Sequence, residues 1–172
     1  MGGGSLPRRT DEVMADSQIA LLLTLIDQAY EQRTWHGPNL RNALRGVDVE
    51  TALWRPSLER HNIWELALHC AYWKYISTKA LRGDGSKDNF IRKPSNFPAI
   101  PEKPTLKAWK EDLGLLEKCH LELRQAVAAL KPEDLNKKSG RWTLAEHAFG
   151  AANHDIYHAG QIRLLRRMKG DA

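Results

Sequence analysis

Apolar residues recur every three or four positions along four long stretches of the chain, with polar residues between them. This spacing places the apolar side chains on one face of an α-helix. We therefore expect four long helices over residues 16–33, 62–83, 106–130 and 143–168. No stretch shows the alternation of apolar and polar positions that is typical of a strand.

The limits of these helices are marked by residues that start or stop helices. Asn62 with Glu65, and Thr143 with Glu146, have the spacing of a capping box, in which the side chains bond to each other's backbone amides. Pro132 follows the third stretch and cannot continue a helix. Two of the four helices therefore have a well-marked start.

The connections between the helices differ in length. Residues 40–44 predict a short helical turn after the first helix. Residues 83–104 contain four prolines and no periodicity, which predicts a loop that is too long for a simple connector in a compact domain. We expect it to be an active-site lid or a crossover, and an ordered surface segment without a catalytic part is the alternative.

Four long helices, one long crossover loop and no strand pattern predict an all-α protein, a four-helix bundle. The 172 residues, of which 42% are hydrophobic, are enough for one domain with its own core. We place this domain at residues 16–170. Residues 1–15, which begin with a glycine-rich segment, are expected to form a flexible tail.

The net charge of +5 raises nucleic acid as a partner, but the positions of the charges argue against it. Arg163, Arg166, Arg167 and Lys169 lie together in the last turns of the final helix, where cations complement the helix dipole. Elsewhere basic and acidic residues alternate, without a basic stripe that carries exposed aromatic residues. We therefore expect no nucleic-acid partner.

The sequence also argues against a membrane protein. The apolar run at 19–26 is far shorter than the roughly 20 residues that cross a bilayer, and acidic residues precede it where a signal peptide is basic. Cys70 and Cys119 form no C-x-x-C motif and no extracellular disulfide pattern. We expect reduced thiols and a cytoplasmic protein.

The main chemical signal is a pair of histidines, His154 and His158, in the last predicted helix. Residues four apart on a helix project from one face, so two imidazoles at this spacing can bind one metal ion. The same stripe has His147, Ala151 and Gln161 where a bundle core would have large apolar residues. The stripe therefore indicates a functional site, and core histidines bonded to backbone or carboxylate groups are the alternative.

A metal site needs a third ligand, and His69 on the second long helix is the candidate. At 1.5 Å per residue, His69 lies about 10 Å from the start of its helix, while His154 and His158 lie about 17 and 23 Å from the start of theirs. These depths coincide if the two helices are antiparallel. Cys70 is rotated about 100° from the stripe of His69 and is not counted as a ligand.

Other residues near the stripe are candidates for supporting roles. Gln161 shares the stripe and is the preferred hydrogen-bond partner of a ligand, with His147 as a second candidate. His147 is about 10 Å along the helix from His158, too far to share its ion. Both His147 and His120 on the third helix are expected to support the ligands or to pack. Asp155 points about 100° away and is expected to pair with another helix.

Several features leave the catalytic residues unassigned. Gly150, Ala151, Ala152 and Gly160 make the last helix slim, which allows either close helix packing or a pocket, and we favour a pocket. Glu65, Tyr157 and His36 are candidate general bases, but no spacing distinguishes them.

These motifs together resemble a known family. His69, the string from His154 to Ile162, the preceding His147 and the segment Trp54-Arg55-Pro56 resemble the DinB/YfiT-like family of metal-dependent enzymes, over residues 18–167. The resemblance implies a four-helix bundle, often a homodimer, that binds a divalent transition metal through His69, His154 and His158. Nickel or zinc is the expected metal, with iron as a third choice.

The resemblance also sets the expected function. Relatives include transferases and isomerases that use low-molecular-weight thiols, so we expect a hydrolase or a thiol S-transferase that acts on a small molecule. The alternative is a non-catalytic metal- or ligand-binding bundle with a structural or stress-sensing role. Three neutral imidazoles leave a metal with an open position, which makes both hydrolysis and thiol transfer available.

Overall fold

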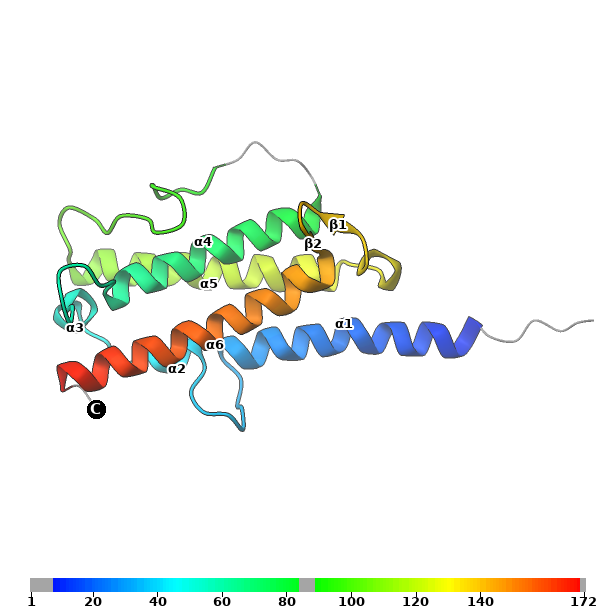
Figure 1. The fold of residues 1–172 in the computed structure, drawn as a ribbon, viewed down its shortest axis with the longest axis horizontal. Coiled ribbons are helices and arrows are strands. Elements are labelled where there is room, and N and C mark those ends of the chain that lie inside the picture. The colour runs from blue at the N-terminus through cyan, green and yellow to red at the C-terminus, as the bar shows by residue number, and fades with distance from the viewer. Residues whose placement is uncertain (1–7, 84–88, 171–172) are drawn as a thin grey trace, which may run out of the picture.

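The computed structural model describes residues 8–83 and 89–170, and the side chains within them from residue 17 onward. Positions 1–7 of the predicted tail and 84–88 of the predicted loop lie outside the described residues. The protein is an all-α four-helix bundle, as predicted (Figure 1). Its long helices are α1 (Arg8–Tyr30), α4 (Ile63–Arg82), α5 (Leu106–Ala128) and α6 (Leu144–Lys169).

Short elements fill the connections. Helices α2 (Leu40–Leu44) and α3 (Val49–Leu53) lie between α1 and α4, and a 3₁₀ turn (Pro132–Asp134) follows α5. Helix α4 packs on both α5 and α6, and α1 packs on α5 and α6. Figure 1 shows that α4 and α6 run in opposite directions. This is the arrangement in which His69 can lie at the same depth as His154 and His158.

Two details differ from the sequence prediction. Helix α1 begins at Arg8 rather than at residue 16 and ends at Tyr30 rather than at residue 33. Its first turns extend beyond the packed part of the bundle, where packing imposes no apolar periodicity on the sequence (Figure 1). Residues 8–15, which we expected in the tail, are therefore helical.

The second difference is a small hairpin, β1 (Lys138–Ser139) and β2 (Trp142–Thr143), between α5 and α6. The expectation of no strands is wrong here, because two residues per strand are too few to produce an alternating pattern. Gly140 takes a positive φ of 65° in the turn, a conformation that glycine adopts without steric cost.

The predicted capping boxes are confirmed and fix the starts of the two helices that carry the candidate ligands. Asn62 accepts from the Glu65 amide and Thr143 from the Glu146 amide, and each glutamate bonds back to the cap amide. These bonds set the register of α4 and α6, and therefore the depth at which each histidine lies.

The interior of the bundle is apolar, with fully buried Trp64 and Trp109, but it also holds a buried ion pair. Lys74 on α4 pairs with Asp155 on α6, and both are almost completely buried. This confirms that Asp155 pairs with another helix. No helix in the described part of the chain combines the length and the apolar character that crossing a membrane requires.

Candidate metal centre

Three imidazole nitrogens meet between α4 and α6. The Nε2 atom of His154 lies 3.1 Å from Nε2 of His69 and 3.0 Å from Nε2 of His158. An ion that is about 2.1 Å from each of two nitrogens holds them roughly 3.0 to 3.4 Å apart, for angles between octahedral and tetrahedral. The structure thus brings together the three histidines that the sequence selected, at a spacing that fits one ion.

Hydrogen bonds fix the orientation of two of these rings. His69 Nδ1 donates to the backbone carbonyl of Asn96 at 2.6 Å, and His158 Nδ1 donates to Oε1 of Gln161 at 2.7 Å. Because the proton is on Nδ1, the lone pair is on Nε2, which is the nitrogen that faces the other histidines. Gln161 thus makes the contact that its place on the stripe predicted.

The electrostatics of the cluster keep its imidazoles neutral. Burial, together with the neighbouring His158, His69 and Lys74, lowers the pKa of His154 to about 3. Burial also lowers the pKa of His158 to about 4, although the bond to Gln161 opposes the shift. The pKa of His69 is lowered by burial as well. At neutral pH the three rings therefore have free lone pairs and need not lose a proton to bind a metal.

The loop between α4 and α5 forms part of the site. Asn96 takes a positive φ of 69°, a conformation that asparagine tolerates better than most residues, and its side chain accepts from Trp73 Nε1 at 2.9 Å. Phe97 stacks on His69 with ring centroids 4.0 Å apart. The predicted crossover thus supplies a backbone acceptor and an aromatic cover to the histidine cluster.

The histidines open into a cavity of about 760 Å³, which we call the histidine cavity. Tyr157, Leu164 and Met168 of α6 form an apolar wall on one side. Ser57, Arg60 and His61, which precede α4, line another side. None of the described residues that line this cavity is an aspartate or a glutamate, so it favours neutral or anionic molecules.

Comparison with known proteins places the chain in a family. The family model of the DinB superfamily matches residues 32–162, which include the three histidines and Gln161. The chain belongs to the DinB superfamily. No curated protein and no solved structure matched it. Helix α1 lies before the matched segment.

In this DinB-superfamily protein, His61 is a site residue that the sequence analysis missed. Its Nδ1 donates to the Glu65 carboxylate at 3.2 Å, and its ring stacks on Phe97 with centroids 3.7 Å apart. Both His61 and His69 are nearly parallel to Phe97 at stacking distance, so the Phe97 ring lies between the two imidazoles. In the sequence, Glu65 could have pointed to His61 as its partner. The sequence analysis interpreted Glu65 only as part of a helix cap and as a candidate general base.

Glu65 is held in its ionised form. Burial raises its pKa, but the two hydrogen bonds from Arg55, at 2.7 and 2.8 Å, and the bond from the Asn62 amide lower it to a greater extent. An ionised carboxylate accepts only, so His61 donates through Nδ1, and Nε2 is the nitrogen left to contact a ligand.

Of the remaining candidates, only Tyr157 lies at the histidine cavity. His147 Nε2 donates to the Ser139 carbonyl of the hairpin at 3.1 Å, and His36 is exposed in the segment after α1. His120 stacks on Tyr30, and neither of its ring nitrogens has a hydrogen-bond partner among the described residues. Tyr157 lines the histidine cavity and has an edge contact with His158.

A second set of ligand atoms overlaps the histidine cluster. Donor atoms of Cys70, His154 and Asp155 also lie within 4.8 Å of one another. However, the Asp155 carboxylate is engaged by Lys74, and burial raises the pKa of the Cys70 thiol well above its usual value. The protonated thiol is a poor ligand, so the three-histidine set fits a metal better.

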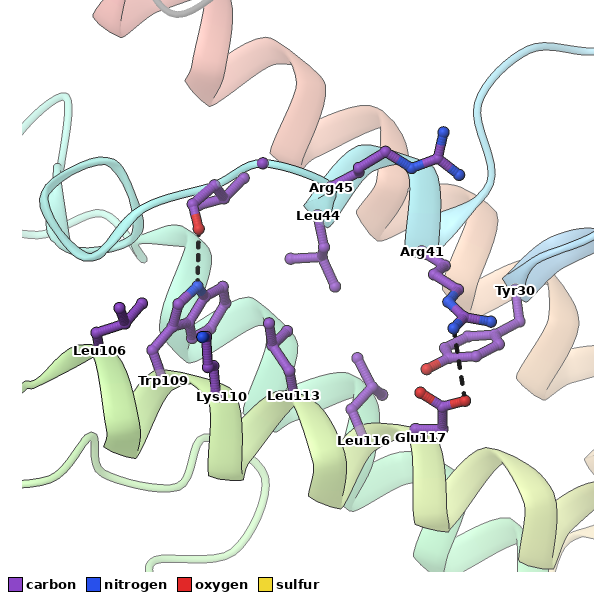
Figure 2. A pocket seen from close by; sticks show the side chains of 12 residues that line it. Tyr30, Arg41, Leu44, Arg45, Leu106, Trp109, Lys110, Leu113, Leu116 and Glu117 are labelled. Atoms are coloured by element: carbon purple, nitrogen blue, oxygen red, sulfur yellow. Dashed lines mark hydrogen bonds and ion pairs between the residues drawn. The ribbon is translucent and has the colours of Figure 1, made fainter.

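Figure 2 shows a further cavity of about 310 Å³ between α5 and the α2 segment. In its lining, Trp109 Nε1 donates to the Val47 carbonyl at 2.8 Å, and Arg41 lies 3.8 Å from Glu117. The described residues that line it include no histidine. This cavity therefore lacks the imidazole ligands that the histidine cavity has.

Proposed function

We propose that this DinB-superfamily protein is a metal-dependent enzyme that acts on a small molecule, with His69, His154 and His158 as the ligands of one divalent transition-metal ion. The observation that carries the proposal is the convergence of three neutral Nε2 atoms at 3.0 and 3.1 Å beside a large cavity. Imidazole ligands suit zinc, nickel and iron, and zinc or nickel is our first choice.

A divalent ion in this site would supply a Lewis acid that lowers the pKa of a bound water or thiol and leaves at least one position open to it. The chain's own residues do the rest. Asn96 and Gln161 hold the rings of His69 and His158 in place, and Phe97 shields His69 from solvent. This arrangement supports both reaction types that we propose, hydrolysis and S-transfer from a low-molecular-weight thiol.

We assign His61 to the polar end of the substrate. Glu65 fixes the ring of His61, and Phe97 separates that ring from His69. A substrate that places one atom at the histidine cluster would therefore present to His61 Nε2 a group that is a few bonds away from that atom. Arg60 lines the cavity next to it and favours an anionic group there. This position suits a small thiol that carries a carboxylate.

We also propose a cytoplasmic homodimer. Leu21 and Leu25 are exposed on one face of α1, where a second copy would cover them. Light scattering of the purified protein measures whether it is a dimer. Cys70 and Cys119 are free and buried, which suits a reducing compartment.

Metal analysis of protein purified without a histidine tag tests the metal site. We expect close to one equivalent of zinc, nickel or iron, or uptake of one equivalent on titration. His154→Ala should lose the metal while its circular dichroism stays helical, and Gln161→Leu should weaken zinc binding by about 10- to 100-fold because His158 loses its acceptor. Protein that neither contains nor takes up a transition metal would refute the proposal.

Activity is tested by screening small thiols with organic electrophiles, and esters and amides with water. Turnover that is lost with a chelator, restored by the metal and absent in His154→Ala would support an enzyme. A His154→Ala protein that loses its fold together with the metal would instead indicate a structural metal.

A further inference from the structure

A second cavity, of about 330 Å³, lies on the other side of the histidine cluster. Trp73 and His154 line both this space and the histidine cavity, so the two cavities share a wall at the candidate metal centre. The indole of Trp73 is fixed in that wall by the bond from its Nε1 to Asn96. Both cavities therefore border the candidate metal centre at His154.

The lining of the second cavity is strongly aromatic. Trp73, Trp142 and Phe149 surround it, and their side chains are 39%, 49% and 41% exposed. Aromatic side chains that stay open to solvent in a concave site bind flat apolar groups through their ring faces. We call this space the aromatic cavity.

The Glu146 and His147 side chains that line the aromatic cavity are already engaged in hydrogen bonds. The Glu146 carboxylate accepts from the amide and the hydroxyl of Thr143, and His147 Nε2 donates to Ser139. The histidine cavity differs, because Arg60 and His61 there have a charge or a nitrogen available to a ligand. The aromatic cavity therefore fits a neutral group, whereas the histidine cavity fits an anionic one.

Small residues of α6 make room for this ligand. Gly150 and Ala151 line the aromatic cavity, and a Cβ atom at Gly150 would meet no other atom within 4 Å. Sequence analysis favoured a pocket beside these residues, and the structure has one there. A large side chain at position 150 would occupy the space that we assign to the ligand.

We propose that the aromatic cavity binds a neutral aromatic group of a second organic substrate, which meets a thiol in the histidine cavity at His154. This inference rests on the proposed function. It favours S-transfer over hydrolysis, because the two cavities give two organic molecules separate binding sites. In such a transfer the thiol sulfur bonds to an electrophilic carbon, the bond from that carbon to an anionic leaving group breaks, and the thiol proton passes to solvent.

The test uses 5-fluoroindole as the probe, with binding to the whole protein followed by fluorine NMR titration. Wild-type protein should bind it saturably, and Gly150→Phe should weaken binding by at least about tenfold. Gly160→Phe is the matched control: it lies on the same helix, is exposed, and lines neither cavity. This control should bind the probe as wild type does.

Zinc uptake by all three proteins is measured in parallel, which separates this inference from the proposed function. Equal probe binding by wild type and Gly150→Phe, or no binding by wild type, overturns the aromatic cavity even if zinc binds to every protein. Probe binding that only Gly150→Phe loses supports the aromatic cavity even if no protein binds zinc, in which case the metal proposal alone fails.

Discussion

His120 has unusual surroundings for a polar side chain. It is 1% exposed, neither ring nitrogen has a partner among the described residues, and its ring stacks on Tyr30 at 3.9 Å. Burial lowers its pKa to about 3, and the cations Lys74, Arg124 and Arg41 act in the same direction. His120 is therefore neutral in the folded protein at a pH where the unfolded chain binds a proton.

The lower pKa of His120 in the folded state than in the unfolded state sets the sign of its effect on stability. Between about pH 6.5 and pH 3 the unfolded state holds the extra proton, so the free energy of unfolding falls as the pH falls through this range. Each pKa unit of difference corresponds to about 1.4 kcal/mol, so the full effect reaches several kcal/mol.

We expect His120→Phe, which keeps a stacked ring but cannot titrate, to lose less stability than wild type between about pH 7 and about pH 5. Urea denaturation of both proteins with a chelator present measures the difference, since the histidine cluster then contributes equally to each. Parallel pH profiles for the two proteins would contradict the assignment.

At the scale of elements, the α4–α5 loop depends on the conformation of one residue. Asn96 combines a positive φ with a backbone bond to His69 and a side-chain bond to Trp73. The loop is thus held to α4 at the two side chains that border both cavities.

Asn96→Ala should cost about 1–2 kcal/mol of unfolding free energy, because alanine disfavours the positive φ and cannot accept from Trp73. Asn96→Gly loses the same side-chain bond but tolerates the φ, so its loss should be smaller. Chemical denaturation measures both variants. If Asn96→Gly is less stable than Asn96→Ala, the positive φ at residue 96 is not the main cause of the lost unfolding free energy.

The elements also show how far sequence reasoning reaches. The long helices and their caps could be predicted, because apolar periodicity and the Asn62–Glu65 and Thr143–Glu146 pairs are local signals. His69 could be placed beside His154 because helix rise converts sequence position into depth. Asn96 and His61 could not be placed, since the path of an aperiodic loop depends on contacts between distant parts of the chain.

At the scale of the whole molecule, the Lys74–Asp155 pair links the two helices that carry the histidines. Both groups are out of water, and Oδ1 of Asp155 has no hydrogen-bond partner among the described residues. A buried pair adds little net stability compared with apolar residues, but removal of one partner leaves an uncompensated charge.

Lys74→Met should therefore destabilise the bundle by about 3–5 kcal/mol, and the double variant Lys74→Met with Asp155→Leu should recover most of that loss. Thermal and urea unfolding of the single and double variants checks this. If the double variant is as unstable as the single one, the pair itself, rather than the isolated carboxylate, stabilises the bundle.

His69 and His154 are 85 residues apart in the chain, and they meet only because α6 returns alongside α4. Synthesis proceeds from the N-terminus, so His69 leaves the ribosome long before its two partners exist. A nascent chain that ends before α6 has one of the three histidines, and it cannot retain an ion as the complete site would. Metal binding at the proposed site would therefore come late in the synthesis of this protein. An occupied site would indicate that α6 has been made and has packed against α4.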